Sequence, residues 1–203
     1  MSPSARYAAY LVDFDGTLYR PHWVKLAMLA ELGLFGLGAL RVLRAFRQLH
    51  ERVRLEDDPR LESPYALQIH RTAELLKLEV AAVEACVAEW MIQRPQRYIR
   101  WFRRTELLSE LHAFRAGGGR TAIVSDYPAR EKLGAIDGAP PFDVIVASGE
   151  PDGPRRLKPA PDGYLLAAER LGVAPERCLV IGDREDADGA AARAAGMDFR
   201  LVG

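Results

Sequence analysis

The feature that most constrains the fold of this chain is a set of short apolar runs, most of them separated by helical sequence. Several runs are apolar throughout, which is typical of strands buried on both faces of a parallel sheet. Strands that alternate with helices in this way indicate an α/β fold. We therefore predict an open parallel sheet of about five strands with helices packed on it. The predicted strands are residues 7–14, 120–126, 143–148, 177–183 and 198–202.

Residues 21–97 interrupt this alternation, because nothing in them resembles a strand. Ser63 and Pro64 suit the N-cap and the first position of a helix. Apolar residues also recur at helical spacing, namely Leu40, Leu43, Phe46, Leu49 and Val53. The arginine row beside them, Arg41, Arg44 and Arg47, is interpreted either as a solvated face or as a surface that faces an anion. We predict a core domain of residues 1–20 and 98–203 and an inserted helical domain of residues 21–97.

Composition excludes several classes of protein. Lys and Arg together number 28, as do Asp and Glu, so no overall positive charge attracts nucleic acid, and we expect no such partner. Cys86 and Cys178 lack the spacing of a zinc site or a disulfide framework, which fits a reducing compartment. No apolar signal segment precedes the first predicted strand, so we predict a cytoplasmic protein. The sequence indicates no particular oligomeric state.

The segment of residues 26–40 is the one stretch that suggests a membrane. It contains Glu31 and three glycines and is shorter than the about 20 apolar residues that a spanning helix needs. We therefore predict that it does not cross a membrane. Peripheral contact with acidic lipid through residues 24–55 is a weaker alternative.

Polar residues follow three of the predicted strands at the point where each strand ends. Asp13 and Asp15 follow the first, Ser125 and Asp126 the second, and Asp183 the fourth. Because the carboxyl ends of parallel strands share one edge of the sheet, we expect these side chains to meet there. Two carboxylates one residue apart repel each other, so a cation is expected beside them.

These residue types suit the transfer of a phosphoryl group. Asp13 can act as a nucleophile, and Asp15 can give and take a proton. Ser125 and Lys158 can bind the phosphoryl oxygens, and the turn at Gly16 can present backbone N–H groups to them.

The acidic residues near the end of the chain suit a metal. Asp183 is followed by Asp186 and Asp188, and hard oxygen ligands of this kind favour Mg²⁺. A magnesium ion would also neutralise the repulsion between the two early aspartates.

Four segments then resemble, in order, the motifs of the haloacid dehalogenase-like (HAD) hydrolase superfamily, specifically its phosphatases. The segments are "DFDGT", "IVSD", "LKPAPDGY" and "IGDREDADGAAARAAGM". The resemblance covers residues 7–19 and 105–203, and the insert matches in its position and helical character. Each motif alone is weak evidence, but four in the right order on predicted strand ends are specific.

The resemblance implies a Rossmann-like core with a helical cap that closes over the site and selects the substrate. It implies that Asp13 forms an aspartyl-phosphate and that Asp15 is the acid and base. Mg²⁺ would be held by Asp13, the backbone carbonyl of Asp15, Asp183 and one further acid, for which the spacing favours Asp188 over Asp186. The implied phosphate-binding residues are Phe14, Asp15, Ser125, Asp126 and Lys158. Tyr19 and Arg20, which lead toward the insert, are weaker candidates for contact with the substrate.

We therefore predict a Mg²⁺-dependent phosphatase, a phosphoric monoester hydrolase, that acts on a small phosphorylated metabolite. A phosphomutase of the same superfamily is one alternative, because it keeps all four motifs. A catalytically idle binding module with this fold is another, as is an enzyme acting on a lipid phosphate near a bilayer. A dehalogenase is disfavoured, because it has no use for the acid and base at Asp15.

Overall fold

A computed structural model describes residues 6–56 and 63–203 of the chain. Five strands form one parallel sheet in the order β3-β2-β1-β4-β5. The strands are β1 (Ala9–Asp13), β2 (Arg120–Ser125), β3 (Val144–Ala147), β4 (Cys178–Gly182) and β5 (Asp198–Leu201). The predicted α/β fold with a parallel sheet is confirmed.

The order of the strands places β1 at the centre of the sheet. In the register, Ala9 pairs with Arg120 of β2 on one side and with Cys178 of β4 on the other. The carboxyl end of β1 is therefore flanked by the carboxyl ends of β2 and β4. The three groups of polar residues predicted at strand ends follow these three strands.

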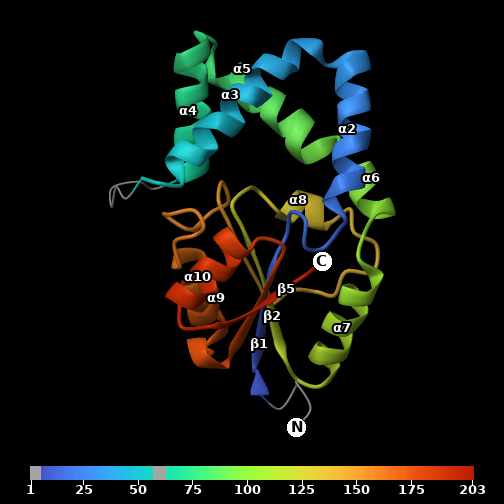
Figure 1. The fold of residues 1–203 in the computed structure, drawn as a ribbon, viewed down its shortest axis with the longest axis vertical. Coiled ribbons are helices and arrows are strands. Elements are labelled where there is room, and N and C mark those ends of the chain that lie inside the picture. Colours follow the sequence, from blue (N-terminus) through green and yellow to red (C-terminus); the bar gives the residue numbers. More distant parts are fainter. Residues whose placement is uncertain (1–5, 57–62) are drawn as a thin grey trace.

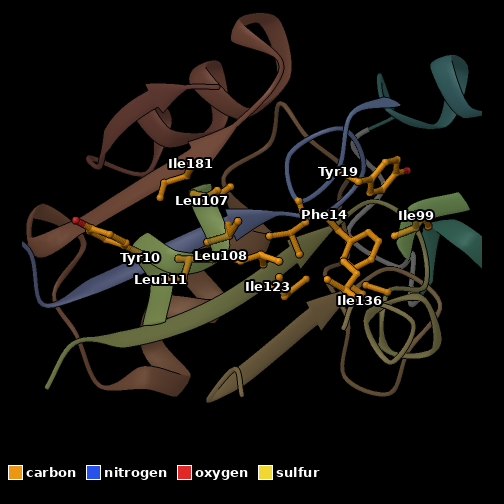
Figure 2. Close-up of a cluster of buried hydrophobic side chains, with 14 of the residues drawn as sticks. Tyr10, Phe14, Tyr19, Ile99, Leu107, Leu108, Leu111, Ile123, Ile136 and Ile181 are labelled. Carbon is orange, nitrogen blue, oxygen red and sulfur yellow. The ribbon is translucent and has the colours of Figure 1, made fainter. Parts of the chain in front are cut away.

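Both faces of the sheet are buried. Successive residues of a strand point to opposite faces, and all five residues of β1 are buried. Tyr10 and Val12 belong to one apolar cluster, which Figure 2 shows with Leu107, Leu108 and Leu111 of helix α7 (Thr105–Ala116). The other face carries Ala9 and Leu11, packed with residues of α9 (Asp162–Leu171) and α10 (Ala190–Ala194). Accordingly, α7 lies on one side of the sheet and α9 and α10 lie on the other (Figure 1). Each fully buried large apolar side chain stabilises the fold by about 1.5–3 kcal/mol.

Short elements connect the strands at both ends of the sheet. They are α8 (Arg130–Leu133), the 3₁₀ helix η2 (Pro175–Arg177) and the π-helix η3 (Glu185–Gly189). Helix η3 begins two residues after Asp183 and carries Asp186 and Asp188.

The segment between β1 and α7 is helical wherever the structure describes regular secondary structure in it. Its elements are α2 (Pro21–Phe35), α3 (Leu37–Val53), α4 (Pro64–Leu76), α5 (Val80–Val87), the π-helix η1 (Ala88–Gln93) and α6 (Gln96–Trp101). Helices α2 to α5 lie beyond one end of the sheet (Figure 1). Helices α3, α4 and α5 share a small apolar core, formed by Val42, Phe46, Ile69, Ala73, Val83 and Val87. An isolated antiparallel bridge joins Tyr19 and Arg103. The chain therefore enters and leaves the inserted helices at neighbouring points.

Local features of this segment follow the sequence in part. The side chain of Ser63 accepts a hydrogen bond from the backbone N–H of Ala66 at 3.2 Å, as expected of an N-cap. The apolar stripe on α3 is buried at Phe46, but Leu40 and Leu43 are only partly buried. These two leucines share the helical spacing predicted from the sequence, but they face a cavity.

The apolar segment of residues 26–40 is divided between α2 and α3. The two helices meet at Gly36, where an added Cβ would lie 2.3 Å from the Trp90 ring, so only glycine fits the corner. Among the described residues, no helix combines the length and the apolar character that crossing a membrane requires.

Candidate active site

Three aspartates meet at the carboxyl edge of the sheet. Asp13 ends β1, Asp183 follows β4, and Asp188 lies in η3. Each contributes one carboxylate oxygen to a group in which all the oxygens lie within 4.8 Å of one another. Asp13 and Asp188 are buried and Asp183 is half-buried. The structure therefore brings together residues that are far apart in the sequence.

Lys158 supplies positive charge to this group. Its ammonium donates to Asp13 Oδ1 at 2.5 Å and to the carbonyl of Val124 at 3.0 Å, and it lies 2.8 Å from Asp188 Oδ1. Burial alone lowers the pKa of a lysine. The neighbouring Asp13, Tyr164 and Asp188 nevertheless raise the pKa of Lys158 well above its usual value. Lys158 is therefore a fixed cation at the centre of the site.

One lysine does not neutralise three carboxylates. Burial raises the pKa of Asp13, and Asp188 and Asp183 raise it further against the lowering effect of Lys158. Burial and Asp188 likewise raise the pKa of Asp183. A site that holds carboxylates against desolvation and mutual repulsion favours an added cation. Three converging carboxylate oxygens are a hard donor set, and Mg²⁺ fits it.

The alternative acid of the late cluster lies elsewhere. Asp186 is exposed and forms an ion pair with Arg184 at 2.6 Å. The side chain of Asp188 instead accepts from the hydroxyl of Tyr164 at 2.8 Å and from the backbone N–H of Arg184 at 3.2 Å. Between the two acids, the structure brings Asp188 beside Asp13.

Gly16 allows the two halves of the site to approach each other. Its φ is +102°, a conformation that residues with a side chain rarely adopt. A Cβ at this position would lie 2.0 Å from Asp183 Oδ2. In the same turn, the hydroxyl of Thr17 donates to Asp13 Oδ2 at 2.8 Å and so helps to orient the carboxylate.

Asp15 has its own set of partners. The ammonium of Lys132, which comes from α8, donates to both of its oxygens at 2.7 and 2.6 Å. The hydroxyl of Tyr19 donates to Oδ1 at 2.7 Å. Lys132 is buried, and its ammonium lies 4.8 Å from the centre of the Phe14 ring. Asp15 is thus paired with Lys132, whereas Asp13 is paired with Lys158.

The end of β2 and the loop that follows it contribute further polar groups to the site. Ser125 is buried, and its Oγ accepts from the backbone N–H of Tyr127 at 3.2 Å. The carboxylate of Asp126 accepts from the backbone N–H of Lys158 at 3.1 Å, which fixes the loop that carries this lysine. His50 of α3 lies 3.9 Å from the same carboxylate.

A cavity of about 700 Å³ lies between the sheet edge and the inserted helices. Its lining includes Asp13, Asp15, Ser125 and Lys158 from the core. On the opposite side it is lined by residues of α2, α3 and η1. A volume of this size is typical of a small-molecule site. The catalytic candidates therefore open into a space that the inserted helices bound.

Some predicted residues lie outside this arrangement. Arg20 is exposed, and the cavity lining includes Tyr19 and Pro21 on either side of it but not Arg20. The side chain of Phe14 is fully buried in the core, so a phosphate contact by Phe14 would have to come from its backbone. Arg44 and Arg47 line the cavity, which supports the anion-facing interpretation for two members of the arginine row.

The sequence reasoning assigned no role to three residues that contact the predicted ones. Thr17 and Tyr164 lie within the quoted motifs, next to the residues that were assigned. Lys132 is harder to find, because it lies outside the four quoted motifs, in a short helix after the loop that follows Ser125. Helix α8 has four residues, and the pairing of Lys132 with Asp15 depends on how that helix packs.

The sequence profile of the haloacid dehalogenase-like hydrolases matches residues 7–196. Fructose-1-phosphate phosphatase YqaB of Escherichia coli (strain K12) is 29% identical, and the match covers 95% of both chains. Phosphoglycolate phosphatase of the same organism is 38% identical over 89 residues, which are 42% of this chain and 34% of that protein.

Solved structures share the fold. A HAD phosphatase from Thermococcus onnurineus has a TM-score of 0.62 at 21% identity, covering 96% of this chain and 86% of that chain. A putative beta-phosphoglucomutase from Thermotoga maritima has a TM-score of 0.52 at 22% identity, covering 96% and 85%. The profile spans nearly the whole chain, including all four motifs, and it confirms the resemblance predicted from the sequence: the protein belongs to the haloacid dehalogenase-like hydrolases.

Proposed function

We propose that this phosphoric monoester hydrolase is a Mg²⁺-dependent phosphatase that acts on a small phosphorylated compound through an aspartyl-phosphate on Asp13. The observation that carries the proposal is the pairing of two carboxylates with two separate cations at one edge of the sheet. Asp13 contacts Lys158, and Asp15 contacts Lys132. Both carboxylates line the same cavity.

The two carboxylates have different parts in the reaction. Asp13 attacks the phosphorus, so that a bond from its carboxylate oxygen forms as the bond to the leaving alcohol breaks. Asp15 gives its proton to the leaving oxygen. It then takes a proton from a water molecule, which attacks the aspartyl-phosphate, releases inorganic phosphate and restores Asp13.

Other groups bind the phosphoryl oxygens during both steps. Lys158 supplies positive charge next to Asp13, and Ser125 supplies a hydroxyl from the end of the neighbouring strand β2. Mg²⁺ would be held by Asp13, the backbone carbonyl of Asp15, Asp183 and Asp188, and when bound it supplies further positive charge for the phosphoryl oxygens.

We propose in addition that residues 21–97 form a cap that selects the substrate. The proposal is supported by the cavity, one side of which these helices line. The cap also contacts the catalytic loops, since Arg54 Nε donates to the carbonyl of Lys158 at 2.7 Å. The similarity to a fructose-1-phosphate phosphatase over 95% of both chains supports a phosphatase with this architecture.

The proposal is tested by measuring phosphate release from a panel of phosphate monoesters, with Mg²⁺ and with a chelator. Replacing Asp13 by Asn is expected to lower kcat by about 10³-fold or more, because the nucleophile is lost. Asp137, an exposed residue whose carboxylate is paired with Arg100, provides the control substitution Asp137→Asn. Undiminished release by Asp13→Asn would exclude the covalent mechanism, and full activity in chelator would exclude the metal.

The same panel distinguishes a phosphatase from a phosphomutase. A mutase would isomerise a sugar phosphate while releasing little phosphate from any member of the panel. An idle binding module would catalyse neither phosphate release nor isomerisation, whichever metal ion is added.

A further inference from the structure

We propose that the substrate is a phosphate monoester of an alcohol with an apolar chain, and that this chain lies between α2, α3 and η1. The inference rests on the proposed phosphatase activity and adds the chemical class of the leaving alcohol. It comes from the distribution of polar and apolar side chains along the cavity.

Helix α2 turns one apolar face to the cavity. Val24, Met28 and Leu32 follow each other at intervals of four residues and all line the cavity, as does Leu29. Residues at this spacing share one face of a helix. Leu29 is 63% exposed, so the described part of the chain leaves most of this side chain uncovered.

Helices α3 and η1 form the other apolar walls. Leu40 and Leu43 lie one turn apart on α3, and both line the cavity. Trp90 and Met91 line it from η1. The Trp90 ring is held in place, because the glycine corner between α2 and α3 lies directly against it. The three helices thus enclose an apolar space from different sides.

The polar cavity residues of α2 and α3 gather toward the core. His50 on α3 lies near Asp126, and Arg54, the residue directly after α3, contacts the loop of Lys158. The C-terminal end of α3 is therefore next to the catalytic groups, and its N-terminal half, with Leu40 and Leu43, is farther away.

Helix α2 runs the other way. It begins just after the bridge between Tyr19 and Arg103, so Lys25 is near the core and Leu32 is distant from it. Both helices therefore present cations or polar groups close to the catalytic carboxylates and leucines farther out.

Arg44 and Arg47 lie between the catalytic groups and the distal leucines. Both line the cavity, and neither forms an ion pair with another residue of ranges 6–56 and 63–203. Cations at this depth suit the anionic head of the substrate. Beyond them, the described lining residues of α2, α3 and η1 are apolar or aromatic. A sugar placed against those walls would lose hydrogen bonds to water without replacement, which costs free energy. An apolar chain there would instead bury apolar surface on both sides.

The reaction on such a substrate needs only water. The phosphorus–oxygen bond to the apolar alcohol breaks, Asp15 protonates the leaving oxygen, and water later releases phosphate from Asp13. The products are the free alcohol and inorganic phosphate.

The test is a series of n-alkyl phosphates from methyl to octyl, assayed below their aggregation concentrations beside sugar phosphates and phosphoglycolate. We expect kcat/KM to rise by roughly twofold to fourfold for each added methylene over the first several carbons. Octyl phosphate should then exceed every sugar phosphate in the panel. A flat series in which methyl and octyl phosphate react equally, or a sugar phosphate that reacts faster than octyl phosphate, would overturn the inference.

Paired variants of α2 locate the effect. Leu32→Gln, inside the cavity, should lower the ratio of kcat/KM for octyl to methyl phosphate by about tenfold. Leu34→Gln, on the same helix but outside the lining, should leave the ratio unchanged. Equal effects of the two variants would contradict a chain in this cavity. If Leu32→Gln does not fold, Leu43→Gln provides the same comparison.

The series also separates this inference from the proposed function. If phosphate is released from short and polar esters without dependence on chain length, the inference of an apolar chain is wrong but the proposed phosphatase activity stands. No release from any ester, including methyl phosphate, removes the phosphatase itself.

Discussion

At the scale of single residues, the two early aspartates differ in what surrounds them. Asp13 lies beside Lys158 and two further carboxylates, whereas Asp15 lies between Lys132 and Tyr19. Two aspartates separated by a single residue thus meet different charges. In the proposed mechanism, this difference allows Asp13 to attack phosphorus and Asp15 to move a proton.

Replacing Lys132 by Met tests how far Asp15 depends on its cation. Met keeps most of the side-chain volume but removes both hydrogen bonds to Asp15. We expect kcat to fall by about tenfold or more, with a smaller change in KM, because acid–base catalysis of this kind contributes about 10²- to 10⁴-fold. Steady-state kinetics with the best substrate of the panel measures both constants. Lys77→Met, at an exposed site, is the control, and equal kcat values for the two variants would exclude a positioning role.

The close approach at Gly16 can be separated from its backbone conformation. Gly16→Ala places a Cβ against Asp183, and Gly118→Ala, at φ +86°, meets no atom within 4 Å. Both variants are strained by about 1–2 kcal/mol, because alanine is unfavourable at positive φ. Only Gly16→Ala should also raise the Mg²⁺ concentration that gives half-maximal activity. Mg²⁺ titrations of the two variants test this, and equal Mg²⁺ requirements would show that Asp183 tolerates the added methyl group.

At the scale of secondary-structure elements, α3 links the inserted helices to the catalytic loops. Its buried residue His50 faces Gln68 of α4 at 3.2 Å and Asp126 of the core at 3.9 Å. The His50 ring also stacks on Tyr127, with the ring centres 4.7 Å apart. One side chain of α3 therefore contacts both α4 and the loop after β2.

This position makes stability depend on pH. Burial lowers the pKa of His50, although Asp126 and Gln68 oppose the effect. Below the unfolded value of about 6.5, the unfolded chain binds a proton that the folded chain resists binding. The contribution of His50 is therefore fully present above that pH and is lost as the pH falls through the lower folded pKa.

We expect the free energy of unfolding to fall more steeply below pH 6.5 in the wild type than in His50→Asn. Denaturant unfolding at several pH values between 5 and 8 measures the difference. The exposed His70 on α4 provides the control His70→Asn, which should keep the wild-type pH dependence. If His50→Asn also keeps it, the buried imidazole is not its source.

At the scale of the whole molecule, the proposed metal site would join residues from the two ends of the chain. Asp13 comes from the first strand, Asp183 directly follows the fourth, and Asp188 lies in η3. A cation bound by all three would stabilise the folded state alone, because the unfolded chain does not bring them together.

Mg²⁺ is therefore expected to raise the midpoint of thermal unfolding. At 100 times its dissociation constant it contributes about 2.7 kcal/mol. For a chain of this size that corresponds to roughly 5–10 °C. The shift should be lost in Asp183→Asn and kept in Asp186→Asn, whose side chain pairs with Arg184 at the surface. Differential scanning fluorimetry with Mg²⁺ or with chelator measures it, and an equal shift in both variants would place the metal elsewhere.

The sequence by itself determined the strands and the residues at their ends. A parallel strand buried on both faces must be apolar along its length, so β1, β2 and β4 were readable as runs. Their polar ends were readable for the same reason, since a buried strand tolerates Asp13 or Ser125 only where it leaves the core. The order of four motifs then predicted the family.

The tertiary structure decided what lies next to those residues. Lys132 meets Asp15 through a separation of 117 positions, and no local pattern encodes that contact. The same holds for Leu40 and Leu43, whose helical spacing is equally compatible with a buried core and with a cavity wall. Helical periodicity shows which residues share a face, but the packing of α2, α3 and η1 decides what that face meets.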